Sequence, residues 1–147
     1  MNNIETIIPI EIIELEDKHN LHPIIEAKIN GNPIRLVIDT GASHTCIDKK
    51  EVKSLLKNKN NISNDIVMGI GNKKMRNTIV NIQELQLGEV IIKDYPVVAL
   101  KISHINKMLK MLGLKPINGL LGSDLLHKYN AVIDYKNSCL TLNTNTL

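Results

Sequence analysis

The sequence contains no tryptophan or phenylalanine and only three tyrosines among its 147 residues. Proteins that bind single-stranded nucleic acid commonly stack the bases on aromatic side chains. Neither lysine-rich stretch, 49–59 or 73–76, has an aromatic platform near it. Net charge is also small, +3 from 18 basic and 15 acidic residues, so it does not require a nucleic-acid partner. We interpret both stretches as solvated surface.

Cysteine is scarce as well. Cys46 and Cys139 lie far apart and have no C-x-x-C or Cys/His spacing typical of a metal site. We expect both to be small buried hydrophobic side chains. His19 and His22 are the one closely spaced histidine pair, and they stand in a loop-like stretch. The sequence therefore predicts no metal site and no cofactor.

Long hydrophobic runs are missing too. Acidic residues between Glu11 and Asp17 interrupt the N-terminal apolar residues, and no basic segment precedes them. This pattern excludes a signal peptide or a membrane span there, so we expect a soluble cytoplasmic protein without a membrane partner. No linker, repeat or low-complexity block divides the chain, and we predict one domain over residues 1–147.

What the chain does contain is Ile, Leu and Val in short runs, and 43% of its residues are hydrophobic. That content can form a packed core without disulfide or metal support, and branched aliphatic residues favour strands. Pro96 places its strand at a sheet edge or a bulge. From the alternation and the turn signals we predict strands at 4–15, 23–30, 33–38, 90–102, 117–121, 131–135 and 139–142, and a hairpin with a glycine-rich tip over 65–87.

Three short helices complete the prediction. The first covers 48–56, with Asp48 as N-cap and Glu51 as its capping-box partner. The second covers 104–112 and is stopped by Gly113. The third covers 124–128, with Ser123 as its cap. Many short strands and a few short helices predict a mainly β domain, closed or sandwich-like.

One segment has the composition of a catalytic loop. An apolar strand delivers an acid, a hydroxyl, a glycine and two small residues in Leu36-Val37-Ile38-Asp39-Thr40-Gly41-Ala42-Ser43. The strand would hold the Asp39 carboxylate on a rigid element, Thr40 can lock the loop through hydrogen bonds, and Gly41 permits a sharp bend. The alternative is that Asp39 only caps the following turn. Burying an acid at the end of an apolar strand is costly, however, so a role beyond capping is expected.

Three segments in this order resemble the retropepsin family of aspartic peptidases. The first, 37–43, is similar to the catalytic loop of that family. The second, 67–72, is similar to its flap. The third, 119–126, is similar to the late segment that packs behind the catalytic loop. The resemblance covers roughly residues 24–142, and it departs from the most compact members in the helix predicted within 101–116 and in the termini.

The resemblance implies a closed β-barrel-like fold and an aspartic endopeptidase that acts on a peptide or protein substrate. Asp39 would be catalytic, and Thr40 and Gly41 would support its loop. The flap, with Gly69, Ile70 and Gly71, would cover the substrate, and Ala42 would join Ile70 in contacting it.

A homodimer follows from the number of acids that this chemistry needs. The mechanism uses two carboxylates that share one proton, whereas the sequence has Asp-Thr-Gly only once. Asp134 lacks the following Thr-Gly, and Asp124 is better explained as an acid in the first turn of a helix. A two-fold dimer would supply a second Asp39, because a symmetric interface repeats each residue.

Other chemistries are less well supported. There is no G-x-S-x-G segment for a serine nucleophile, and Gly69-Ile70-Gly71 lacks the third glycine of a dinucleotide loop. Two functional alternatives stay open. One is a catalytically silent peptide-binding or scaffolding module with the same fold. The other is a self-processing domain of a longer precursor, against which the Met1 start counts.

Overall fold

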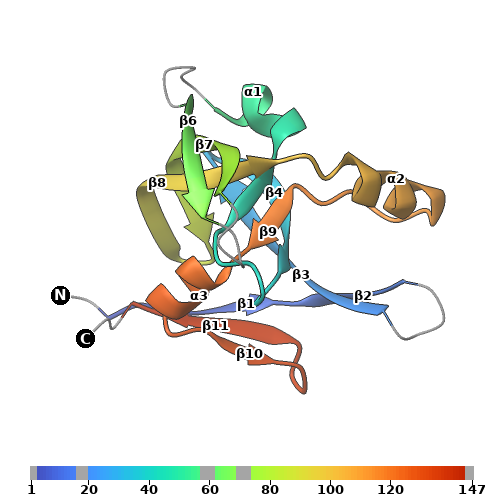
Figure 1. The fold of residues 1–147 in the computed structure, drawn as a ribbon. Helices are drawn as coiled ribbons and strands as arrows, with labels where there is room; N and C mark the ends of the chain where they lie inside the picture. Colours follow the sequence, from blue (N-terminus) through green and yellow to red (C-terminus); the bar gives the residue numbers. More distant parts are fainter. Residues whose placement is uncertain (1–2, 16–19, 57–61, 69–73, 145–147) are drawn as a thin grey trace.

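The structure, a computed structural model, describes residues 3–15, 20–56, 62–68 and 74–144. It contains an eight-stranded sheet and a separate three-stranded sheet (Figure 1). The strands are β1 (Glu5–Pro9), β2 (Glu11–Leu15), β3 (Asn20–Ile29), β4 (Asn32–Ile38), β5 (Cys46–Asp48), β6 (Ile62–Met68), β7 (Lys74–Leu87), β8 (Val90–Leu100), β9 (Gly119–Leu121), β10 (Val132–Asp134) and β11 (Cys139–Asn143). The helices are the 3-10 turn η1 (Lys49–Glu51), α1 (Val52–Leu55), α2 (Ser103–Met111) and α3 (Ser123–Lys128).

Six strands form a closed barrel in the order β3-β4-β9-β5-β8-β7. The ring closes because β3 pairs with β4 from Ile24 to Ile29 and also with β7 through Lys28 and Ile29. Strands β2 and β6 extend the sheet beyond the ring. This confirms the predicted mainly β, closed fold. The most deeply buried side chains are aliphatic and include Ile25, Ile29, Ile34, Leu36, Ile47, Ile82, Leu85, Leu87 and Leu121.

The three-stranded sheet brings the two ends of the chain together. Strand β1 pairs with β11, Glu5 lying opposite Asn143, and β11 pairs with β10 in the predicted terminal hairpin. Figure 1 shows this sheet next to α3. The strand predicted at 4–15 is therefore two strands that serve different sheets, divided at Ile10.

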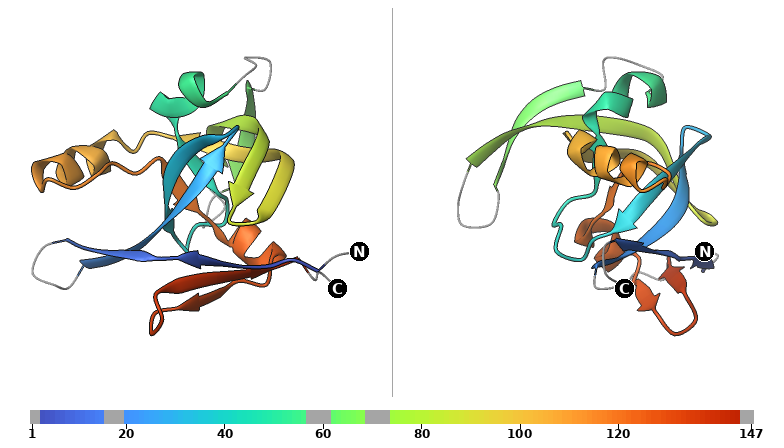
Figure 2. Two further views of the ribbon diagram at one scale, coloured as in Figure 1. Left: turned by 180° about the vertical axis from the view of Figure 1, so that it is seen from behind. Right: turned by 90° about the vertical axis from the view of Figure 1, so that its right-hand side faces the viewer.

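Two arms project from the same side of the barrel (Figures 1 and 2). One arm is the β2–β3 hairpin, and the other is α2 with the segment 112–118 that follows it. A second apolar cluster lies between them and is formed by the buried residues Ile13, Ile24, Ile102, Leu109 and Ile117. No helix in the described part of the chain is both long enough and apolar enough to cross a membrane.

The helix predicted at 48–56 is shorter and less regular than expected. Asp48 does cap it, since its carboxylate accepts a hydrogen bond from the Lys50 N–H at 3.2 Å. The capping box with Glu51 is wrong, because the Asp48 N–H instead donates to the Asn118 carbonyl at 2.7 Å. Residues 46–48 form strand β5, which is too short to show an alternating pattern in the sequence.

Of the other local predictions, two are confirmed and one is wrong. Helix α2 ends just before Gly113, which has a φ of +70°, as the sequence predicted. Strand β8 has β5 as a second partner only from Val98 to Leu100, so Pro96 lies on a locally free edge, also as predicted. The cap assigned to Ser123 is wrong, because α3 begins at Ser123 and its N-cap is Gly122.

Candidate active site

Strand β4 places Asp39 at the start of the loop that joins it to β5. The strand lies inside the barrel sheet, between β3 and β9. It runs parallel to β9 with Ile38 opposite Leu121, and the Asp39 N–H donates to the Leu121 carbonyl at 3.0 Å. The apolar run before Asp39 thus holds the acid on an element paired on both sides, as the sequence suggested.

The Asp39 carboxylate is half-buried and makes one contact within its own turn. Its Oδ1 accepts the Gly41 N–H at 3.0 Å. A Cβ at Gly41 would lie 3.3 Å from that same oxygen, so a glycine here leaves room for the carboxylate. The turn-capping contact that the sequence left open is therefore present. It uses one oxygen of an acid that also borders a cavity.

The loop 39–45 is held from behind by the start of α3. The Ser123 N–H donates to the Ala42 carbonyl at 2.8 Å, and the Ser123 hydroxyl donates to the Thr40 carbonyl at 2.7 Å. A Cβ at Gly122 would lie 2.7 to 2.8 Å from main-chain atoms of His44 and Thr45, so only glycine permits this approach. Thr40 is thus locked through its main chain, while its side chain is exposed.

Asp124 ties three elements together beside the loop. Its two carboxylate oxygens accept the Thr45 hydroxyl and the Tyr95 hydroxyl, each at 2.7 Å. The Thr45 oxygen in turn accepts the Gly122 N–H at 3.0 Å. Asp124 does lie in the first turn of α3 as expected, but both of its oxygens are used in this network.

Two nearby groups have raised pKa values. Burial, followed by the hydrogen bond to Asp124, raises the pKa of the Tyr95 hydroxyl above its ordinary value. Burial, with smaller contributions from the charges of Asp124 and Asp39, raises the pKa of the Cys46 thiol to about 11. Cys46 is buried as expected, whereas Cys139 is only half-buried. In both cases the low polarity behind the loop disfavours the charged form of the group.

An apolar cavity of about 520 Å³ opens beside Asp39 and Thr40. It lies between the two arms, and its size suits a large side chain or a small ligand. The residues that line it are Ile13, Leu21, His22, Pro23, Ile24, Val37, Ile38, Asp39, Thr40, Ile105, Met108, Leu109, Ile117, Leu120, Ile133 and Tyr135. Ala42, which the sequence assigned to substrate contact, is not one of them.

The other predicted residues divide between described and undescribed parts of the chain. Gly69, Ile70 and Gly71 lie outside the described residues, so their flap role stays a prediction. The flanking strands β6 and β7 form the expected hairpin. Asp134 lies in the terminal hairpin, where hydrogen bonds from the Asn137 main chain and side chain lower its pKa. Among the described residues there is no cluster of three or more potential metal ligands.

Sequence reasoning missed the residues that close the cavity and brace the loop. Nothing local marked Ile105 and Met108 as neighbours of Asp39, because β9 and the two arms meet only in the tertiary structure. The sequence predicted the helix at 104–112 but not the elements against which it packs. Thr45 and Tyr95 carried no signal that could have been read from spacing alone.

Comparisons with known proteins agree with this geometry. A family model described as aspartyl protease matches residues 25–125, more than half of the chain. No curated protein is significantly similar to this chain in sequence.

Two solved structures share the fold. The crystal structure of a retropepsin-like aspartic protease from Rickettsia conorii is 21% identical, covers 97% of this chain and 92% of its own, and has a TM-score of 0.60. The retroviral protease-like domain of Ddi1 from Leishmania major is 15% identical to this chain and has a TM-score of 0.53. The match covers 82% of this chain and 85% of that domain's chain. From the family match, this chain belongs to the aspartyl protease family, and it shares its fold with the two retropepsin-like structures.

Proposed function

We propose that the protein is an aspartic endopeptidase in which Asp39 and the Asp39 of a second copy activate water against a peptide carbonyl. The observation that carries the proposal is the position of Asp39 beside an apolar cavity, on a loop braced from behind by main-chain and side-chain hydrogen bonds. A braced loop keeps the carboxylate in one place, which is what a positioned catalytic acid requires.

The need for a second copy comes from the acids that one chain offers. Near the loop, Asp124 is committed to the hydroxyls of Thr45 and Tyr95, and Asp134 is committed to Asn137 in the terminal hairpin. Both carboxylates are thus engaged by partners other than Asp39. A symmetric homodimer would bring a second Asp39, so that one carboxyl acts as base toward water and the other as acid toward the peptide.

The substrate we propose is an extended peptide with an apolar side chain in the cavity. Its main chain would pair with strand edges, as extended peptides do in other sheet proteins. The cavity lining supports this class, because Leu120, Ile105 and Met108 offer apolar contacts in the cavity that Asp39 borders. Exclusion of water from such a site would strengthen the electrostatic interactions of the carboxyl pair.

The test is Asp39→Asn, assayed on a mixed library of peptides. The substitution is nearly isosteric and keeps the oxygen that accepts the Gly41 N–H, so we expect the fold and the dimer to survive while hydrolysis falls by a factor of 10³ or more, on the order of 4 kcal/mol. Asp94→Asn is the matched control, since Asp94 is exposed on β8 and its φ of +51° suits asparagine.

Two outcomes would count against the proposal. Equal activity in Asp39→Asn and wild type would remove Asp39 from the chemistry. A wild-type protein that binds library peptides without cleaving any would support the silent peptide-binding module, in which Asp39 serves only its turn.

A further inference from the structure

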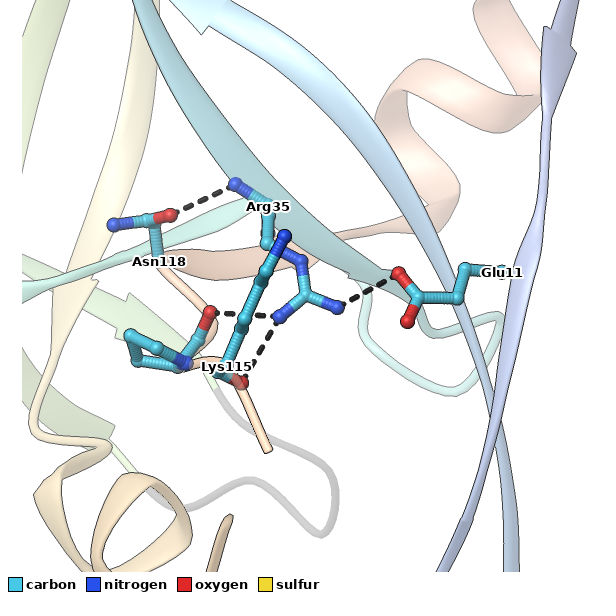
Figure 3. Close-up of polar contacts among 5 residues, drawn as sticks. Glu11, Arg35, Lys115 and Asn118 are labelled. Atoms are coloured by element: carbon cyan, nitrogen blue, oxygen red, sulfur yellow. Dashed lines mark hydrogen bonds and ion pairs between the residues drawn. The ribbon is translucent and has the colours of Figure 1, made fainter. Parts of the chain in front are cut away.

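The two arms that enclose the cavity are joined at their base by a single side chain. Arg35 lies on β4, four positions before Asp39, and its side chain is only 12% exposed. Figure 3 shows its guanidinium between Glu11 of the first arm and the segment 115–118 that ends the second. Arg35 itself does not line the cavity.

Arg35 contacts both arms at once. Its Nη2 donates to Glu11 Oε2 on β2 at 2.8 Å. Its Nη1 donates to the carbonyls of Lys115 and Pro116 at 2.9 and 3.1 Å. These carbonyls directly precede Ile117, which is part of the cavity wall. One guanidinium therefore bridges β2 and the chain that returns from α2 (Figure 3).

The main chain of Arg35 strengthens the same junction. Its N–H donates to the Asn118 side-chain oxygen, and its carbonyl accepts the Asn118 N–H, both at 2.7 Å. Asn106 of α2 makes a matching pair with Ile117, donating to its carbonyl at 3.0 Å and accepting its N–H at 2.9 Å. The end of the segment 112–118 is thus fixed both to β4, through Asn118, and to α2, through Ile117.

Geometry, more than charge, explains the choice of arginine. Glu11 is 61% exposed, and ion pairs at such sites contribute little to stability. The planar fork of a guanidinium, however, can address three acceptors in fixed directions, whereas a lysine ammonium is a point charge on a flexible stem. A lysine could bond to the acceptor of one arm while leaving the carbonyls or carboxylate of the other without that donor.

We propose that Arg35 is a positioning residue that sets the width of the substrate cavity and so determines how well large apolar side chains bind. The inference rests on the proposed peptidase function. It predicts an effect on substrate binding and not on the chemical step, because the Asp39 loop is braced separately by Gly122, Ser123 and Asp124.

The experiment compares Arg35→Lys, Glu11→Gln and wild type on two peptides, one with leucine and one with alanine at the position that fills the cavity. For Arg35→Lys we expect KM for the leucine peptide to rise about tenfold while kcat stays within twofold, with a smaller rise for the alanine peptide. Glu11→Gln keeps an acceptor and should raise KM about twofold. Lys93→Gln is the control, since it removes an exposed ion pair with Glu84 on the far strands, and should change neither constant.

Amide hydrogen exchange gives a readout that does not need activity. Arg35→Lys should speed exchange across 105–118 and leave 39–45 unchanged. Unchanged exchange in 105–118, or a fall in kcat equal for both peptides, would overturn the inference and reduce Arg35 to ordinary fold support. If wild type cleaves neither peptide, the proposed function fails, and faster exchange in 105–118 would still support the role of Arg35 in joining the arms.

Discussion

At the scale of single residues, Thr45 connects the Asp39 loop to the rest of the molecule. Its side chain is 3% exposed, and its hydroxyl both donates to Asp124 and accepts the Gly122 N–H. A buried hydroxyl with both functions satisfied stabilises its neighbours mainly by avoiding unpaired groups. Gly122 also approaches His44 too closely for any side chain, so Thr45 and Gly122 fix the same point of the loop.

Replacing Thr45 by valine keeps the shape and removes both hydrogen bonds. We expect Thr45→Val to lower the free energy of unfolding by about 2 kcal/mol, because the Gly122 N–H is left without its acceptor. Peptidase activity per folded protein should also fall several-fold as the loop loosens. Thr45→Ser retains the hydroxyl and should stay within about 0.5 kcal/mol of wild type. Urea unfolding together with kcat measures both effects, and a valine variant that matches the serine variant would show that the network is dispensable.

At the scale of elements, the β6–β7 hairpin is the long projection expected to cover the substrate. Its strands are paired from Ile62 opposite Val80 to Met68 opposite Lys74. The tip that joins them holds Gly69 and Gly71 on either side of Ile70. If this tip closes over bound peptide, its conformational freedom should matter more for turnover than for folding.

Gly71→Val should therefore reduce kcat/KM at least tenfold, about 1.4 kcal/mol of transition-state stabilisation, with only a modest fall in melting temperature. Gly31→Val is the matched control. Gly31 is also a hairpin-tip glycine, with a φ of +81° and no atom within 4 Å of an added Cβ. The Gly31→Val variant should lose stability through backbone strain and keep its activity per folded molecule. Unchanged efficiency in Gly71→Val would remove residues 69–71 from the site.

At the scale of the whole molecule, activity should depend on protein concentration. One chain has one Asp-Thr-Gly, so a dimer would hold the complete site and a monomer half of it. Dilution below the dissociation constant of the dimer should lower the specific activity, and not only the total rate. Sedimentation and initial rates measured over the same concentration range test this. Constant specific activity in a monomeric sample would be incompatible with a site shared between two copies.

Much of the site's framework could be predicted from local sequence. Apolar runs and alternation marked most strands, and the Asn30-Gly31 and Gly88-Glu89 turns joined the right pairs of strands. An acid after an apolar run marked the Asp39 loop, whose catalytic role stays a prediction. These signals are local, because side-chain direction alternates along a strand and turn residues act on their own backbone. The local rules for helix caps failed where a residue distant in the sequence offered a competing hydrogen bond. The Asp48 N–H donates to the Asn118 carbonyl instead of the Glu51 side chain. The Ser123 hydroxyl donates to the Thr40 carbonyl instead of capping its own helix.

The sequence by itself determined the fold class, the family resemblance and Asp39 as the candidate acid, since each depends on residue types at short spacing. Only the tertiary structure decided what surrounds that acid. Closure of the barrel brings β9 beside β4, so that Leu121 and Ser123 hold a loop some eighty positions earlier. The arms meet across Arg35 for the same reason, because partners that are distant in the chain become neighbours only when burial of the apolar faces fixes the register of the strands.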